Sequence, residues 1–450
     1  MAYIANTPDD VRVMLGAIGL DSLDQLFDMI PPEFRLGRPL AIPEALSELE
    51  LTAQVGALLA ENRGADLRPC FLGGGSYDHF IPAVVDNLAA RGEFYTAYTP
   101  YQAEASQGTL QATFEYQTLI AQLTGMDVSN ASLYDGGSAV SEAVLMAMTV
   151  TRRLGRVVVA GSVHPEYRQV LETNLANLEP EVVVVPARGG RVEPADLAAA
   201  ITDDTPAVVI AYPNFFGQLE DVDRLVAEAR KKGALAIVSV DPISLGLLRR
   251  PGSYDADIVV AEGQSLGNPL GYGGPYLGIL ACRESFVRKM PGRVVGQTVD
   301  RSGKRCFVLT LQTREQHIRR EKATSNICTN QGLLALRASI YLAALGPGGL
   351  RKVAELSARK AHYAAERLAE VPGLSIAFPG PFFKEFAVRS AKDPVAVLAE
   401  VGRLGYHGGI ALGRWDPDLA DTILIAVTEK RTRAEIDGLA EAYRKAMASA

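Results

Sequence analysis

The chain has 450 residues, enough for two or more domains. Its apolar fraction of 48% and charged fraction of 22% are those of an ordinary soluble globular protein. The net charge of −7 argues against nucleic acid as a main ligand, and we find neither an apolar run long enough to span a bilayer nor a secretory or mitochondrial leader.

Residues 1–65 predict a helical N-terminal arm. Thr7 can cap a helix whose first turn holds Pro8, Asp9 and Asp10. Apolar side chains recur at helical spacing through the rest of the arm, and no strand is expected for them to cover. We therefore expect the arm to pack against the main domain or against another chain.

Residues 66–325 alternate between expected strands and expected helices. The expected strands are apolar and rich in β-branched residues: 128–134, 156–160, 182–185, 207–211, 234–240 and 258–260. Strands of this kind are buried on both faces, so the pattern predicts a large α/β domain with a mainly parallel sheet and helices on each side.

Residues 326–450 have a different character. A long apolar helix is expected over 331–345, ended by the glycines and proline of 346–349, and a second helix over 350–368. Short strands and helices alternate after it. This pattern predicts a small C-terminal α+β domain with its own sheet.

A glycine-rich turn at Asp135 to Ala139 follows a strand and opens a helix. The backbone amides of Gly136, Gly137 and Ser138 can hold a phosphate at such a helix start, with the Ser138 hydroxyl helping. The alternative is a tight strand-to-helix turn that Ser138 caps.

Three more polar residues each follow an expected strand. His164 can stack on a ring ligand or form a local hydrogen bond, and Asn214 can reach a ligand's phenolic oxygen or form an ordinary Pro-Asn turn. Asp241 can pair with a pyridinium nitrogen or cap the turn that begins at Pro242. A strand that ends in Asp, followed by a strand and a glycine-rich loop, is the layout of the pyridoxal-phosphate enzymes of the aminotransferase fold, fold type I.

This chain lacks the lysine that supplies the reactive amine in those enzymes. The loop after the strand at 258–260 should carry the lysine that forms the Schiff base. Gln264 and Ser265 stand there instead, and no lysine lies between Lys232 and Lys289. We therefore expect a vestigial cofactor pocket and no cofactor on this chain.

A tyrosine-rich segment runs from residue 95 to residue 102. Its rings, hydroxyls and amide come from Tyr95, Tyr98, Thr99, Tyr101 and Gln102, and its proline argues for a loop. The segment is either a packed surface loop or a wall of a binding pocket on another chain. Because this fold class builds active sites at a dimer interface, we favour the second interpretation, an active-site wall that acts in trans.

Long stretches of the chain resemble the glycine cleavage system P-proteins. They are FLGGGSYDHFIPAVV at 71–85, the segment from FYTAYTPYQ to LYDG at 94–136, GNPLGYGGPYLG at 267–278 and REKATSNICTNQ at 320–331. The resemblance covers nearly the whole chain. It is to the N-terminal half of these proteins, which in the two-subunit form is a separate chain, subunit 1.

The resemblance implies a subunit of glycine dehydrogenase (aminomethyl-transferring, decarboxylating), an oxidoreductase of glycine catabolism. Subunit 2 would bind pyridoxal phosphate covalently, glycine would be decarboxylated on it, and the aminomethyl group would pass to the lipoyl arm of H-protein. An α2β2 heterotetramer is expected. This chain would complete the partner's site.

Two other functions stay open at this point. A non-catalytic scaffold or regulator can reuse the same fold, and a self-contained pyridoxal-phosphate enzyme could use a distant lysine such as Lys289 or Lys322. The four cysteines are widely spaced and form no Cys-x-x-Cys pair, which favours reduced thiols, no metal site and a cytoplasmic location.

Overall fold

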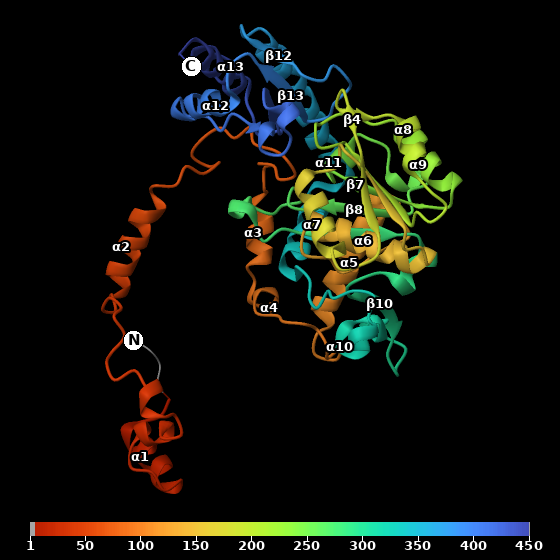
Figure 1. Ribbon diagram of the computed structural model, residues 1–450. Helices are drawn as coiled ribbons and strands as arrows, with labels where there is room; N and C mark the ends of the chain where they lie inside the picture. Colours follow the sequence, from red (N-terminus) through yellow and green to blue (C-terminus); the bar gives the residue numbers. More distant parts are fainter. Residues whose placement is uncertain (1–4, 450) are drawn as a thin grey trace. The chain divides into compact units, whose positions relative to one another are not determined.

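The computed structural model describes residues 5–449 (Figure 1). The chain divides into two units, the first ending at Arg63 and the second beginning at Gly64. The division of the second unit into two domains at residue 326 stays a prediction.

The first unit is helical. It contains α1 (Pro8–Ala17), α2 (Glu48–Leu59) and short 3-10 turns at Leu23–Phe27 and Pro32–Phe34. The predicted cap of α1 is confirmed: the Thr7 hydroxyl accepts from the Asp10 amide at 3.2 Å, and the Asp10 carboxylate accepts from the Thr7 amide at 2.8 Å. The unit's own elements bury only Leu15 among its described residues.

The main sheet of the second unit has the strand order β1-β9-β8-β7-β6-β2-β3. Its strands are β1 (Val128–Ser129), β2 (Arg156–Ala160), β3 (Glu181–Val185), β6 (Ala207–Tyr212), β7 (Leu235–Val240), β8 (Ile258–Glu262) and β9 (Gly278–Cys282). The five strands from β8 to β3 are parallel, whereas β9 is antiparallel to β8 and β1. The expected mainly parallel sheet is confirmed.

The expected strand over 128–134 is wrong in length. Only Val128 and Ser129 pair with β9 as a strand, because the chain then turns and the Ala131 amide donates to the Arg293 carbonyl instead. Leu133 returns to the sheet as a single bridge to Gly278.

Helices cover the sheet in the layered manner expected for buried parallel strands (Figure 1). They are α5 (Gln107–Thr124), α6 (Gly136–Thr151), α7 (Pro165–Leu175), α8 (Pro194–Ala200) and α9 (Val222–Lys231). The core between these layers consists of side chains such as Val144, Val158, Leu225 and Val259. The carboxyl ends of β7 and β8 lie at one edge of this core, where polar side chains gather.

A second sheet lies in the C-terminal part, with the order β12-β13-β15-β14 and antiparallel pairing throughout. Its elements are β12 (Leu374–Ile376), β13 (Glu385–Ser390), α12 (Pro394–Arg403), β14 (Ile410–Ala411), β15 (Thr422–Ala426) and α13 (Arg433–Ser449). The expected small α+β fold with its own sheet is confirmed.

The segment α11 (Gly332–Ala369) contains the two helices expected over 331–368. They are separated at Gly346, whose backbone, with a φ of 58° and a ψ of −179°, is not helical, so the expected break is confirmed. By length and composition α11 could cross a membrane. Buried side chains such as Ala338 and Ala361 place it in the two protein cores instead.

The remaining elements are short. They are α3 (Ala83–Ala89), α4 (Gly92–Tyr95), β4 (Ala187–Arg188), β5 (Arg191–Val192), the hairpin of β10 (Val294–Val299) and β11 (Arg305–Thr310), and α10 (Gln316–Arg319). Phe71 ties the start of the second unit to the C-terminal sheet: it is fully buried in that core, its amide donates to the His407 carbonyl at 2.8 Å, and its carbonyl accepts from the Ala426 amide at 3.0 Å. This attachment brings the segment from Gly73 to Phe80 between the two sheets.

Phe71→Ala should lower the free energy of unfolding by about 3–5 kcal/mol, because it removes a large buried ring from the C-terminal core. Urea denaturation of the full chain measures the change. Phe80→Ala is the matched control, since this ring is exposed and its loss should cost less than about 1 kcal/mol. Equal costs for the two substitutions would contradict the bracing role of Phe71.

Candidate functional site

Asp241 forms a buried ion pair at the carboxyl end of β7. Its Oδ2 lies 2.8 Å from Nζ of Lys384, which directly precedes β13, and the two side chains are 10% and 1% exposed. Asp241 Oδ1 also accepts from the Ile243 amide at 3.0 Å, so the residue caps the turn as well. The second contact corresponds to the turn interpretation of Asp241, whereas the cation at its other oxygen is a lysine of the same chain.

The Lys384 ammonium has two further partners. Its Nζ lies 2.9 Å from Nε2 of His79 and 3.4 Å from the centre of the Tyr77 ring. Because an ammonium only donates, His79 Nε2 accepts and Nδ1 carries the proton, which it donates to Glu429 at 2.6 Å. Burial, and then the charge on Lys384, lower the pKa of His79, in agreement with a neutral ring.

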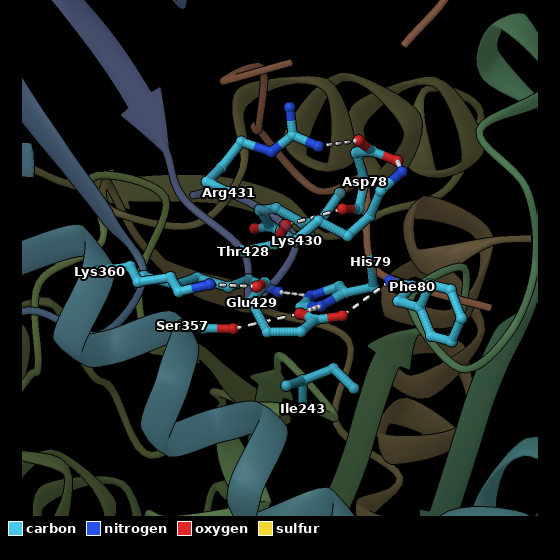
Figure 2. A network of polar contacts seen from close by, with 12 residues as sticks. Asp78, His79, Phe80, Ile243, Ser357, Lys360, Thr428, Glu429, Lys430 and Arg431 are labelled. Carbon is cyan, nitrogen blue, oxygen red and sulfur yellow. Dashed lines mark hydrogen bonds and ion pairs between the residues drawn. The ribbon is translucent and has the colours of Figure 1, made fainter. Parts of the chain in front are cut away.

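The ion pair belongs to a larger network that joins residues 78–80 to residues 428–431 (Figure 2). Glu429 also accepts from the Phe80 amide at 2.7 Å. Asp78 pairs with Lys430 at 2.6 Å and with Arg431 at 3.1 Å. Burial raises the pKa of Glu429, but the hydrogen bond and the charge of His79 and the backbone hydrogen bonds together outweigh it, and this pKa lies below its usual value.

Glu262 occupies the start of α6, where a phosphate was considered. Its carboxyl accepts backbone hydrogen bonds from Gly136 at 2.9 Å, Gln264 at 2.9 Å and Leu277 at 3.0 Å. Burial raises the pKa of Glu262 to about 8, while the three donors act in the opposite direction. The Gly136 amide therefore already has an acceptor within the chain.

The alternative interpretation of this turn also needs a correction. Asp135, not Ser138, caps α6, because the Ser138 amide donates to Asp135 Oδ1 at 2.7 Å. The N-cap residue precedes the helix, and its side chain accepts from the amide of the third helical residue. Ser138 is itself that third residue, so it cannot be the cap. Gly137 is buried in that turn.

His164 and Tyr167 form a ring pair beside the pocket. The two rings stack at 4.5 Å with an interplanar angle of 18°. His164 Nε2 donates to the Gly74 carbonyl at 2.7 Å, and its Nδ1 accepts from the Glu166 amide at 3.1 Å. One face of the His164 ring is thus in contact with a side chain of the protein.

Asn214 uses both ends of its amide within the chain. Its NH2 group donates to the Gly190 carbonyl and to Glu220, each at 2.8 Å. Its carbonyl accepts from the amides of Phe216 and Gln218, each at 3.0 Å. These contacts correspond to the turn interpretation of Asn214.

Gln264 and Ser265 are buried at the position of the missing lysine. Gln264 Oε1 accepts from the Tyr77 amide at 2.8 Å, and its Nε2 donates to the carbonyls of Asn268 at 2.8 Å and Tyr77 at 3.2 Å. Among the described residues the Ser265 hydroxyl finds no hydrogen-bond partner. Neither residue brings an amine to the site.

The cavity that remains here has a volume of about 60 Å³, room for a few waters. It is lined by Gly75, Tyr77, His164, Tyr167, Asn214, Asp241, Glu262 and Glu385, with neighbouring apolar residues. No amine is available for a Schiff base, Asp241 is paired, and the Gly136 amide is bonded. The residues present do not fit pyridoxal phosphate, and within the described chain no His, Cys, Asp or Glu side chains group as metal ligands.

The tyrosine-rich segment borders a larger cavity of about 240 Å³. Tyr95, Tyr98 and Thr99 line it, together with Arg293 and Asn330. Tyr95 and Tyr98 are 67% and 88% exposed. Aromatic rings that line a cavity and are also exposed to solvent leave apolar surface on which another molecule can pack.

Arg293 holds the end of this segment in place. Its guanidinium is buried, donates to the Cys328 carbonyl at 2.8 Å and to the Tyr101 hydroxyl at 3.3 Å, and lies 5.5 Å from the Tyr101 ring centre. Glu315 lies 3.8 Å from its Nε. Tyr101 therefore anchors the loop, while Gln102 is exposed and does not line the cavity.

Sequence reasoning missed Lys384, Glu385 and Glu262. Glu385 accepts from the Gly74 amide and from the Tyr77 hydroxyl, each at 2.7 Å, and burial raises its pKa to about 7. Lys384 and Glu385 could have been found as two adjacent charges in the otherwise apolar run FFKEFAV. Glu262 could have been found as a carboxylate at the end of a buried strand, a position like that of Asp241.

Comparisons with known proteins agree on one family. A family model described as glycine cleavage system P-protein matches residues 1–443. The chain is 53% identical to the probable glycine dehydrogenase (decarboxylating) subunit 1 of Carboxydothermus hydrogenoformans, over 98% of this chain and 99% of that one. It is 51% identical to the protein of the same description from Thermomicrobium roseum, with both chains fully covered.

Solved structures give the same result. A crystal structure of glycine decarboxylase (P-protein) of the glycine cleavage system, in inhibitor-bound form, matches with a TM-score of 0.93 and 46% identity, over 99% of this chain and 100% of that chain. The glutamate decarboxylase of Lactobacillus brevis matches with a TM-score of 0.67 at 14% identity, over 94% and 98% of the two chains, which shows the fold alone. The expected aminotransferase-like fold is confirmed.

Asp241→Asn should lower the free energy of unfolding by about 3–5 kcal/mol, because it leaves the buried Lys384 ammonium without its counter-ion. The double variant Asp241→Asn with Lys384→Met should recover most of that loss. Urea denaturation of the full chain gives both values.

Asp223→Asn is the control for this experiment. Asp223 pairs with Arg249 at the surface, so its loss should cost less than about 1 kcal/mol. An Asp241→Asn variant as stable as the wild type would show that the buried ion pair is not formed.

Proposed function

The chain belongs to the glycine cleavage system P-protein family, and from this premise we propose that it is the lysine-less subunit of a two-subunit glycine decarboxylase. Subunit 2 of the same fold binds pyridoxal phosphate covalently. The two chains pair as αβ and assemble as α2β2. The names of the similar chains, subunit 1, support a separate partner.

In this proposal the complex decarboxylates glycine and passes the aminomethyl group to the lipoyl arm of H-protein, while carbon dioxide leaves. Pyridoxal phosphate on subunit 2 supplies the electron sink for decarboxylation. This chain contributes no Schiff base, because Gln264 and Ser265 stand at the lysine position and its own pocket does not fit the cofactor.

The observation that most supports this proposal is the exposed tyrosine loop beside the cavity of about 240 Å³. A small zwitterion such as glycine needs polar groups that orient it and apolar surface that keeps water away. Tyr95, Tyr98 and Thr99 offer hydroxyls and rings together, and no nucleophile stands among them. The loop therefore has the chemistry of a wall that serves an active site on the partner.

The buried support under the loop is part of this proposal. Arg293 holds Tyr101 through a hydrogen bond and through the face of its ring, so the end of the loop is fixed before the partner arrives. A wall that is already ordered loses little conformational entropy when the complex forms. Gln102 directly follows Tyr101 and is exposed, and in this proposal its amide reaches the partner.

Tyr98→Phe and Gln102→Ala should each lower the rate of glycine–bicarbonate exchange by the reconstituted enzyme about 10- to 100-fold. Loss of one hydrogen bond to a charged substrate, of about 1.5–3 kcal/mol, corresponds to this range. Co-purification with subunit 2 should be unchanged. Tyr272→Phe is the matched control, because Tyr272 is a tyrosine with 83% exposure outside the loop.

Unchanged exchange across the loop substitutions would contradict the wall and favour a scaffold. A second measurement tests the self-contained alternative. The isolated chain is mixed with pyridoxal phosphate, treated with borohydride and digested, and no lysine should carry a stoichiometric label. A labelled Lys289 or Lys322 would make this chain the cofactor-binding one.

A further inference from the structure

The pocket at the ends of β7 and β8 has the two charge positions that a pyridoxal phosphate site uses. An Asp at the end of a strand faces a ring nitrogen, and amides at a helix start face a phosphate. In this chain both positions already have partners, Lys384 at Asp241 and Glu262 at Gly136. Neither partner is a residue that sequence reasoning had assigned to the site.

At Asp241, the ammonium of Lys384 has a partner for each of its hydrogen-bond donors. The three N–H bonds of the Lys384 ammonium correspond to three neighbours: Asp241 at 2.8 Å, His79 at 2.9 Å and the Tyr77 ring face at 3.4 Å. A buried ammonium is tolerated only with such partners, because an unpaired one loses its hydration without replacement. A free ligand could use Asp241 only by displacing Lys384.

The position expected for a phosphate is also filled. The Glu262 carboxyl accepts from the Gly136 amide in the first turn of α6, and its second oxygen is held by two other backbone amides. These three donors fix the carboxyl in front of the helix start. The side chain thus takes the amide contact that a phosphate oxygen would take.

The space between the two ends is also used. The Tyr167 ring lies against His164 in a stacked pair, and both rings line the same cavity as Asp241 and Glu262. About 60 Å³ remains, which holds a few waters and no aromatic ring.

We propose that the pocket carries its own occupant: Lys384 replaces the cationic ring nitrogen of a cofactor, Glu262 replaces its phosphate, and the pair excludes pyridoxal phosphate and similar phosphorylated pyridines from this chain. Lys384 comes from the C-terminal sheet, and Asp241 and Glu262 come from the main sheet. The Lys384–Asp241 pair therefore also joins the two sheets across the pocket, with the Asp78 and Glu429 contacts beside it (Figure 2).

This inference rests on the proposed function only for the identity of the excluded ligand. The first test needs no variant. The full chain is treated with acetic anhydride, and modification of each lysine is followed by mass spectrometry. Lys384 should react at least about tenfold more slowly than the exposed Lys304 in the native chain, and equally fast in urea. Similar native rates would overturn the proposal, because the pocket would then open freely.

The second test vacates the pocket. Pyridoxal 5′-phosphate is titrated into the wild type, into Lys384→Ala with Glu262→Ala, and into the surface control Lys304→Ala with Glu284→Ala. The pocket variant should bind one equivalent at least about tenfold more tightly than the other two. A pocket variant that keeps its circular dichroism spectrum and binds no more tightly than the wild type would overturn the proposal.

A single substitution covers the case in which the double variant does not fold. Lys384→Ala leaves Asp241 as a buried anion without a cation, so N-methylpyridinium should raise its unfolding temperature. The same probe should not stabilise the wild type or Lys384→Ala with Asp241→Asn. Equal responses from all three chains would overturn the proposal. None of these readouts depends on the tyrosine loop, so they fail independently of the proposed function.

Discussion

The buried ion pair between Lys384 and Asp241 is the contact on which this structure depends. It joins the end of β7 in the main sheet to the start of β13 in the C-terminal sheet at 2.8 Å. Two buried charges persist only when each satisfies the other and the remaining donors find partners. His79 and Tyr77 supply those partners, which explains why the segment from Gly73 to Phe80 lies between the sheets.

The chain has two different cavities, the pocket at the strand ends and the cavity beside the tyrosine loop. The pocket at the strand ends keeps the framework of a cofactor site but satisfies it internally, whereas the tyrosine loop presents exposed rings over an open cavity. In the proposed function, the open wall completes a site that another chain provides.

Errors in the sequence interpretation have local causes. The strand expected at 128–134 is short, because the Ala131 amide donates to the Arg293 carbonyl and not to a neighbouring strand of the sheet. Ser138 is not the cap of α6, because Asp135 reaches the same amide from the N-cap position.

The sequence by itself determined the strand-helix alternation, the parallel sheet, the absence of a lysine at Gln264 and Ser265, and the position of Asp241. Each of these depends on residues that are neighbours in the chain, where periodicity and spacing are visible. Only the tertiary structure decided what Asp241 and Gly136 bind. Lys384 and Glu262 lie far from these partners in sequence, and their pairing follows from the packing of two sheets that no local pattern records.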